Sequence, residues 1–144
     1  MSTVGDILAR KGHEVISVRP TATVLSAANL MNERGIGGVL VLEGDELVGI
    51  FTERDVLRRV VAQGRDPATT LVSSVMSSPV TGAEPRMSID ECAALMTERR
   101  IRHLPVRGTQ GISGMITIGD VLAFQVSEQQ TTIQQMNSYI YDLR

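Results

Sequence analysis

The stretch GIFTERDVL, Gly49–Leu57, returns later in the chain as GMITIGDVL, Gly114–Leu122. Each copy runs from an apolar segment, which favours a strand, through Thr-x-x-Asp into a second apolar segment. A shift of 65 residues aligns the whole windows 20–57 and 85–122 without a gap, with thirteen identical positions. Identities spread over windows of this length indicate a duplicated folding unit and not one short motif.

Both windows predict the same order of elements, which is a helix, two strands and a second helix. Apolar residues recur at helical spacing from Val24 and again from Ile89. Gly35 is expected to end the first of these helices, since glycine favours the left-handed C-cap. Its counterpart is Arg100, so the second helix is expected to end differently. A short helical turn and an extended segment are expected before each window.

The predicted fold class is α+β. We expect two units, residues 1–65 and 66–126, each a three-stranded sheet with helices on one face, packed as a pseudo-twofold pair. A C-terminal helix over residues 127–144 is expected to follow. A unit of about 60 residues is marginal for a stable core. The two units are therefore expected to pack against each other.

The C-terminal segment carries an apolar stripe with heptad-like spacing, formed by Val126, Ile133, Met136, Ile140 and Leu143. The residues between them are mainly Gln, Ser, Thr and Asn. A short helix is marginal in water by itself, so this one must dock. Two surfaces remain open for it, namely the protein's own units and a second chain.

Composition excludes several classes of function. The formal net charge of −2 argues against a broad grip on nucleic acid. Cys92, His13 and His103 do not form a metal-ligand spacing, so no metal site is expected. The sequence shows no signal peptide and no apolar run long enough for a membrane span, which favours a cytoplasmic protein without membrane contact.

The repeated Thr-x-x-Asp has two chemical interpretations. With Thr52 as an N-cap, the first-turn N–H groups favour an anion, and Arg54 can bind a phosphate bidentately. The carboxylate of Asp55 can accept hydrogen bonds from a ribose diol. The alternative is that Asp55 only caps the helix by bonding back to Thr52. The same two interpretations apply to Thr117 and Asp120.

Two longer segments carry a family resemblance. MNERGIGGVLVLEGDELVGIFTERDVL (Met31–Leu57) and MTERRIRHLPVRGTQGISGMITIGDVL (Met96–Leu122) resemble CBS domains arranged in tandem. The resemblance implies a protein that is not an enzyme. It implies binding of AMP, ADP, ATP, NAD(H) or S-adenosylmethionine between the two units, regulation of an unidentified partner protein, and a homodimer.

The resemblance also implies how each cleft is completed, because the Thr and Asp of one unit face the other unit in this family. The residues expected opposite Thr52 and Asp55 are Val80, Thr81, Ile101, Arg102 and His103. The residues expected opposite Thr117 and Asp120 are Val15, Ile16, Ile36 and Gly37. Since Arg54, Arg102 and His103 gather at the first site, we expect the Asp55 cleft to hold a phosphorylated ligand more tightly.

The sequence leaves three classes of function. The first is a regulatory module that senses energy or redox state through an adenosine nucleotide. The second is a ligand-free dimerisation module in which both Thr-x-x-Asp motifs only cap helices. The third is an enzyme acting on the nucleotide, for which the sequence offers no catalytic residues, neither a nucleophile–base pair nor a Walker-type glycine loop.

Overall fold

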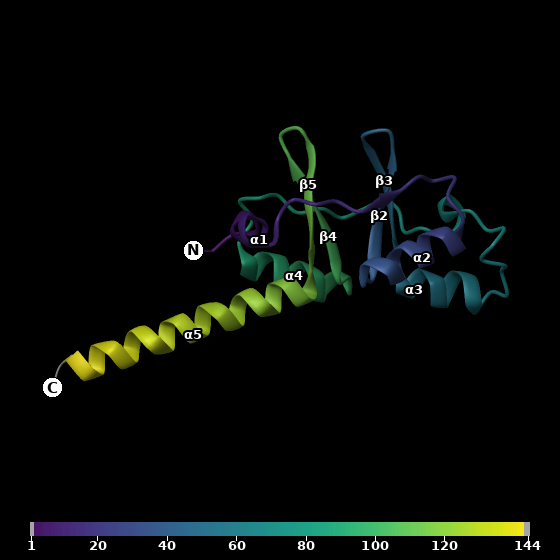
Figure 1. The fold of residues 1–144 in the computed structure, drawn as a ribbon. Coiled ribbons are helices and arrows are strands. Elements are labelled where there is room, and N and C mark those ends of the chain that lie inside the picture. Colours follow the sequence, from purple (N-terminus) through teal and green to yellow (C-terminus); the bar gives the residue numbers. More distant parts are fainter. Residues whose placement is uncertain (1, 143–144) are drawn as a thin grey trace.

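The computed structural model describes residues 2–142, which form two α+β units side by side and a long C-terminal helix (Figure 1). The elements of the first repeat are α1 (Val4–Lys11), β1 (Ser17–Val18), α2 (Val24–Arg34), β2 (Gly38–Glu43), β3 (Glu46–Thr52), α3 (Glu53–Asp55) and the π-helical η1 (Val56–Val61). The elements of the second repeat are the 3₁₀ turn η2 (Val72–Ser74), α4 (Ile89–Arg99), β4 (His103–Gly108), β5 (Gly111–Thr117) and α5 (Ile118–Asp142). The predicted α+β class is confirmed.

The strand pair β2–β3 and the strand pair β4–β5 have the same pairing register, shifted by 65 residues. β2 pairs antiparallel with β3 and parallel with β1, which gives the predicted three-stranded sheet in the first repeat. β4 and β5 form an antiparallel pair, and the third strand is reduced to a parallel bridge between Ala83 and Val106. That bridge lies 65 residues after the pairing of Val18 with Val41, so the repeat extends into the opening strand.

Helices α2 and α4 begin and end with the same cap geometry. The side chains of Thr23 and Ser88 accept hydrogen bonds from the N–H three residues on, at 3.1 and 3.0 Å. Gly35 ends α2 in the left-handed conformation, as predicted, with φ 63°. Arg100 ends α4 in the same conformation with φ 54°, so the expectation of a different ending is wrong. The strain of a non-glycine residue there costs on the order of 1 kcal/mol.

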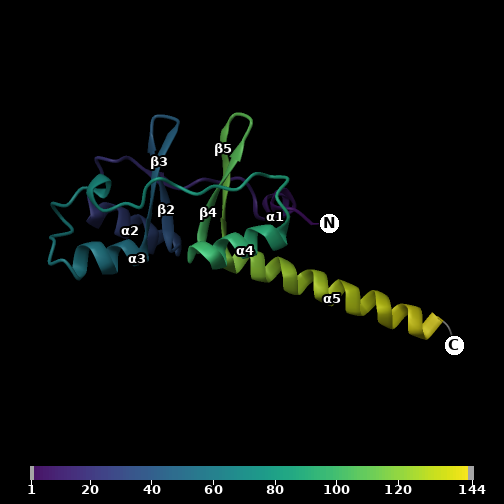
Figure 2. The same cartoon turned by 180° about the vertical axis from the view of Figure 1, so that it is seen from behind.

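The opening segment of each repeat packs in the core of the other repeat. Val4 and Leu8 of α1 are buried with residues of α4, β4, β5 and α5. Val72 and Val75, in and after η2, are buried with residues of α2, β2 and β3. Figures 1 and 2 show the chain crossing between the units after α1 and again before α4. Each core is therefore completed by the other repeat.

Gly49 and Gly114, which open the two repeated stretches, lie under these opening segments. A Cβ atom on Gly114 would lie 2.7 Å from Cδ2 of Leu8, and one on Gly49 would collide with Sδ of Met76. Leu8 and Met76 occupy corresponding positions in the two openings, 68 residues apart. Glycine therefore recurs at these positions because no side chain has room there.

Helix α5 is longer than predicted. It runs without a break from Ile118 to Asp142, so the last helix of the second repeat and the expected C-terminal helix are one element. Its first turns pack on α4 and β5, whereas its second half projects away from the body (Figure 1). Four stripe residues of the described part are half or more exposed, namely Val126, Ile133, Met136 and Ile140. The fifth, Leu143, lies outside the described residues.

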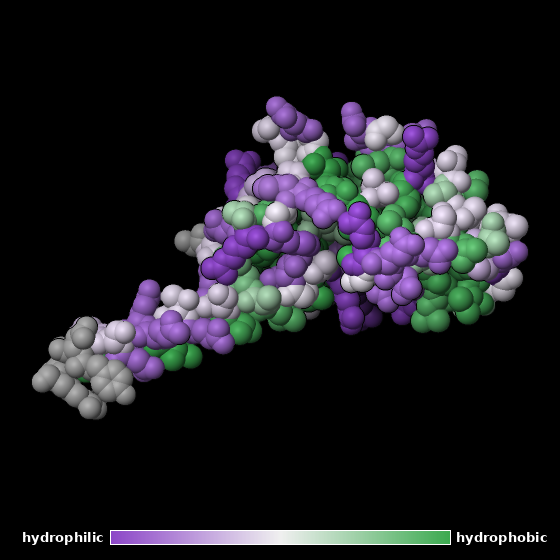
Figure 3. All heavy atoms as spheres, viewed as in Figure 1, coloured by the Kyte–Doolittle hydropathy of each residue, from purple (hydrophilic) through white to green (hydrophobic). Residues whose placement is uncertain are grey.

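The surface has an uneven distribution of hydrophobic residues. Figure 3 shows them along the lower edge of the unit that contains α3 and at intervals along α5. Leu57 and Val61 are the exposed apolar residues of η1. Within residues 2–142, no helix has both the length and the apolar character that crossing a membrane requires.

Candidate functional site

Both Thr-x-x-Asp motifs form capping boxes. The backbone N–H of Thr52 donates to Oδ2 of Asp55 at 3.0 Å, and the N–H of Asp55 donates back to Oγ1 of Thr52 at 3.4 Å. The corresponding distances for Thr117 and Asp120 are 2.8 and 3.1 Å. The capping interpretation of the repeated motif therefore describes part of its role in both units.

The carboxylate of Asp55 is nearly enclosed. Ser77 donates its hydroxyl to Oδ1 at 3.0 Å, and Nε of Arg59 lies 3.7 Å from the same oxygen. Asp55 is only 5% exposed, and it is one of two buried polar residues among those described. Ser77 therefore occupies an acceptor position at Oδ1 for which a ligand hydroxyl would compete.

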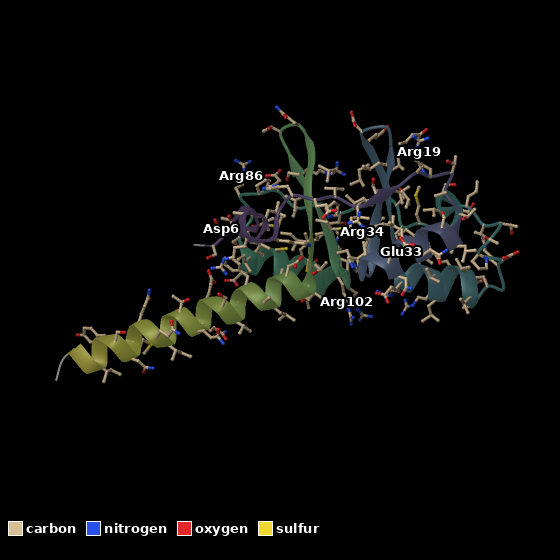
Figure 4. All side chains as sticks on the ribbon, in the orientation of Figure 1. Asp6, Arg19, Glu33, Arg34, Arg86 and Arg102 are labelled. Atoms are coloured by element: carbon tan, nitrogen blue, oxygen red, sulfur yellow. The ribbon has the colours of Figure 1, made fainter. Side chains whose placement is uncertain are left out.

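A cleft opens beside Asp55, between the two units. Its volume is about 970 Å³. It brings together six predicted site residues, namely Thr52, Arg54, Asp55, Ile101, Arg102 and His103. Figure 4 places Arg102 at this junction, next to the unit that contains α2. Gly37, which was expected at the Asp120 site, also lines this cleft.

Val80 and Thr81 are not among the residues that line the cleft, and Ser77 takes the place expected for them. Ser77 is held there by backbone hydrogen bonds in both directions with Ile50 of β3, at 2.8 and 3.0 Å. The parallel pairing of this segment with β4 begins only at Ala83. Val80 and Thr81 lie half-buried in the connection between these two anchors.

Positive charge dominates the cleft. Its lining contains the guanidinium groups of Arg54, Arg58, Arg100 and Arg102 against two carboxylates. Arg54 is positioned across the units, since its Nη1 donates to the backbone carbonyl of Arg100 at 2.9 Å. The strained Arg100 therefore also fixes a side chain of the opposite unit.

His103 lies where the units meet. Burial lowers the pKa of its imidazole below the usual value, the carboxylate of Glu53 opposes this shift, and Lys11 and Arg102 add to it. The ring lies close to Gly37 and Gly38, because Cβ atoms built on these glycines would fall within 3.5 Å of Nε2. The pKa of His103 is therefore lowered at a site beside a mainly positive cleft.

The apolar part of the lining comes from both units. It consists of Ile50, Leu57, Met96, Ile101 and Ile118. The sequence did not identify most of this set, and it did not identify Arg58 or Ser77, whereas Arg100 was one of two arginines expected near this cleft. The spacing of Leu57 and Arg58 directly after Thr-x-x-Asp was a usable signal for those two residues, because they follow on the same helix.

The second motif has different surroundings. Nζ of Lys11, at the end of α1, donates to Oδ2 of Asp120 and to the backbone carbonyl of Met115, each at 2.7 Å. Burial by itself would raise the pKa of Asp120, but hydrogen bonds from Lys11 and Thr117 outweigh it and hold that pKa below its usual value. Asp120 therefore forms an ion pair with Lys11, a residue of the first repeat.

The residues expected opposite Asp120 occupy several places. Ile16 and Ile36 pack against the core of the first unit, and Val15 is half-buried in the segment before β1. Their part in a second cleft stays a prediction. Among residues 2–142, no group of three or more His, Cys, Asp or Glu side chains is arranged to hold a metal ion.

The comparisons with known proteins agree on one family. The CBS domain matches residues 4–62 and again residues 72–127. The CBS domain-containing protein YhcV of Bacillus subtilis is 36% identical over 129 residues, which cover 90% of this chain and 89% of that protein.

Two solved structures extend the agreement to the fold. A protein with CBS domains from Burkholderia ambifaria superposes with a TM-score of 0.86 and 43% identity, covering 89% of this chain and 96% of its own. A hexameric CBS-CP12 protein from bloom-forming cyanobacteria gives a TM-score of 0.75 and 31% identity, covering 85% and 70%. The chain thus belongs to the CBS domain family and carries two copies of the domain in tandem.

Proposed function

We propose that this protein is a regulatory module that binds an adenosine-containing nucleotide, such as AMP, ADP, ATP or NAD(H), in the cleft beside Asp55. The observation that carries the proposal is the lining of this cleft. An apolar wall from both units faces four guanidinium groups in a space of about 970 Å³. That combination suits a ligand with a flat apolar base at one end and phosphate at the other.

Each part of the ligand has a matching group. Ile101 and Ile118 offer aliphatic surfaces between which an adenine ring can stack. Arg54 and Arg102 approach from opposite units and are able to bind phosphate oxygens bidentately. Thr52 and Asp55 are the acceptors for the ribose hydroxyls, once Ser77 has turned away from the carboxylate.

The proposed regulation follows from the position of the cleft. A ligand between the units favours the arrangement in which both sides of the cleft contact it. Because the opening segments are exchanged between the cores, a change in this arrangement reaches both units. A partner protein that binds one arrangement better would read the occupancy of the cleft. The protein itself needs no catalytic step for this role.

A second copy of the chain is the proposed partner for the exposed apolar helices. Leu57 and Val61 of η1 are 63% and 64% exposed. Their counterparts 65 residues on, Leu122 and Val126 of α5, are 54% and 50% exposed. A face that repeats with the pseudo-twofold relation suits a symmetric partner. Between residues 122 and 140, α5 carries one charged side chain, Glu128, so two copies meet with little charge repulsion.

The alternative is a dimerisation module that ignores nucleotides. It is favoured by one specific observation, because Asp55 is 5% exposed and fully engaged as a helix cap. In that case the Thr-x-x-Asp motifs contribute only to stability, by about 1 kcal/mol each. The two functions differ in the role of Arg54 and Arg102. These arginines bind phosphate in the regulatory module, whereas the helix caps do not require them.

Calorimetric titration with AMP, ATP, NADH and S-adenosylmethionine distinguishes the two. We expect micromolar binding of at least one ligand and a loss of roughly ten- to hundredfold in Arg54→Gln and in Arg102→Gln, as for a charged hydrogen bond. Arg86→Gln is the matched control, since Arg86 lies on another part of the surface (Figure 4). Binding of none of the four ligands supports the dimerisation module instead.

A further inference from the structure

Helix α1 is bonded to the second Thr-x-x-Asp motif by its last residue. Lys11 donates to Asp120 of α5 and to the carbonyl of Met115 on β5, both at 2.7 Å. The side chains of Lys11 and Asp120 are 36% and 24% exposed. A ligand from solvent can therefore reach this ion pair and compete for the carboxylate.

The arrangement has no equivalent at the first motif. The corresponding carboxylate, Asp55, receives a neutral hydroxyl from Ser77 and the guanidinium of its own helix. Lys11 lies where the first repeat has three more residues before its proline than the second repeat. The extra residues thus give one of the two motifs a charged contact from the other repeat.

Arg10, the residue before Lys11, contacts α5 near the start of its projecting half. The guanidinium carbon of Arg10 lies 4.6 Å from the centroid of the Phe124 ring, a cation–π contact. Its Nη1 donates to Oγ of Ser127 at 3.2 Å. Phe124 is the last buried residue of α5 before its exposed half. Arg10 therefore contacts α5 where it leaves the body of the protein.

Helix α1 is short and well fixed between these contacts. Its start is closed by the capping box of Thr3 and Asp6, and Leu8 fits against Gly114. Ser2, just before the helix, also hydrogen-bonds Glu128 of α5. Arg10 and Lys11 are neighbours in the last turn of α1, so a movement of this turn displaces both side chains.

We propose that Arg10 and Lys11 form a relay through which occupancy of the Asp120 site is read at helix α5. A ribose diol and the Lys11 ammonium compete for the same carboxylate, so the ligand binds only the state in which Lys11 is released. Release frees the last turn of α1, and the hold of Arg10 on Phe124 and Ser127 weakens. The ligand-dependent half of this relay rests on the proposed nucleotide function, whereas the contacts themselves do not.

The relay is tested first without any nucleotide, by hydrogen exchange of the full-length protein. Lys11→Met keeps the length of the side chain and releases Asp120. We expect faster exchange of amides 124–132 in this variant than in the wild type. In the Arg10→Gln background the Lys11→Met change should have no further effect there, because the two residues act in series. Unchanged exchange of α5 in Lys11→Met, or additive effects in the double variant, overturns the relay.

Titration with AMP and ATP then tests the competition. Since the exposed ion pair is modest, Lys11→Met should tighten binding at the Asp120 site by about two- to fivefold. In the wild type, the bound ligand should speed exchange of amides 124–132, and Arg10→Gln should bind equally well without that response. An equal response in Arg10→Gln overturns the relay and leaves nucleotide binding intact. Absence of binding contradicts the proposed function, while the nucleotide-free experiment still decides the relay.

Discussion

Ser77 donates its hydroxyl to Oδ1 of Asp55 at 3.0 Å and thereby occupies the carboxylate that a ribose would need. Ser77 comes from the opening segment of the second repeat and is held in place by backbone bonds to Ile50. In the proposed complex, a ribose hydroxyl would therefore compete with Ser77 for Oδ1 of Asp55.

Removing this hydroxyl should favour the ligand. In Ser77→Ala, Asp55 keeps its bonds to Thr52 and its ion pair with Arg59, but a ligand no longer competes with the Ser77 hydroxyl. Nucleotide affinity should therefore rise by about fivefold, as expected for one hydrogen bond of about 1 kcal/mol. Calorimetry measures this change. Ser78→Ala is the neighbouring control, since Ser78 is exposed. Weaker binding in Ser77→Ala would mean that the hydroxyl contacts the ligand itself.

The two glycines under the opening segments should be sensitive to a single methyl group. Gly49→Ala and Gly114→Ala force Met76 or Leu8 out of place, and overpacking of this kind typically costs about 1–3 kcal/mol. Urea unfolding followed by circular dichroism gives the loss. A Cβ atom on Gly119 would lie 3.5 Å from Oγ1 of Thr117, an ordinary contact, so Gly119→Ala should instead stabilise the protein by up to about 1 kcal/mol. Equal effects at all three positions would contradict the packing described.

His103 should link stability to pH. Because burial lowers its pKa in the folded protein, protonation favours the unfolded chain. Its contribution to stability is complete above the unfolded value of about 6.5 and falls as the pH drops through and below that value. Denaturation of wild type and His103→Gln between pH 8 and pH 5 measures the difference. A steeper acid loss in His103→Gln than in wild type would refute it.

The same residue should make ligand binding depend on pH. A phosphate near His103 stabilises the imidazolium, so binding takes up a proton and affinity should rise as the pH falls below about 6.5. The phosphate of the ligand also titrates in this pH range. The pH dependence of affinity in His103→Gln therefore reports the contribution of the phosphate without that of His103. The prediction fails if the two proteins show the same pH profile.

The exposed stripe of α5 should hold two chains together. Ile133→Glu and Met136→Glu place charges in the proposed interface and should shift the protein to monomers in sedimentation experiments. Gln134→Glu adds the same charge to the same stretch of helix outside the stripe and should leave the dimer intact. A wild-type protein that sediments as a monomer at high micromolar concentration would contradict the assignment of a second copy to this face.

Much of the fold could be predicted from the repeat. Helix starts at Thr23 and Ser88, the hairpins and the helix after Thr52 depend on local signals that stand in both copies. The exchange of opening segments has no local signal, because it depends on contacts between residues far apart in the chain. Gly49 and Gly114, which recur in both copies, are the sequence feature that reflects this exchange.

The candidate site also contains residues that local sequence signals predict and residues that only long-range contacts place. Thr52, Arg54 and Asp55 follow from the motif, and the cleft brings Arg102 and His103 to them as expected. Lys11 could not be placed from the sequence, because it lies in the extra residues of one repeat and its partner Asp120 is 109 positions away. Ser77 was missed because the pairing with Ile50 is a single bridge.

The most direct test of nucleotide binding beside Asp55 is the titration of AMP into wild type, Asp55→Asn and Asp120→Asn. Asparagine preserves the size of the side chain, and its amide oxygen can still accept the hydrogen bond from the backbone N–H of Thr52 or Thr117. We predict that Asp55→Asn loses AMP affinity by roughly tenfold or more, as for a hydrogen bond to a charged group, and that Asp120→Asn loses much less. Equal loss in both variants, or no loss in Asp55→Asn, would contradict the account.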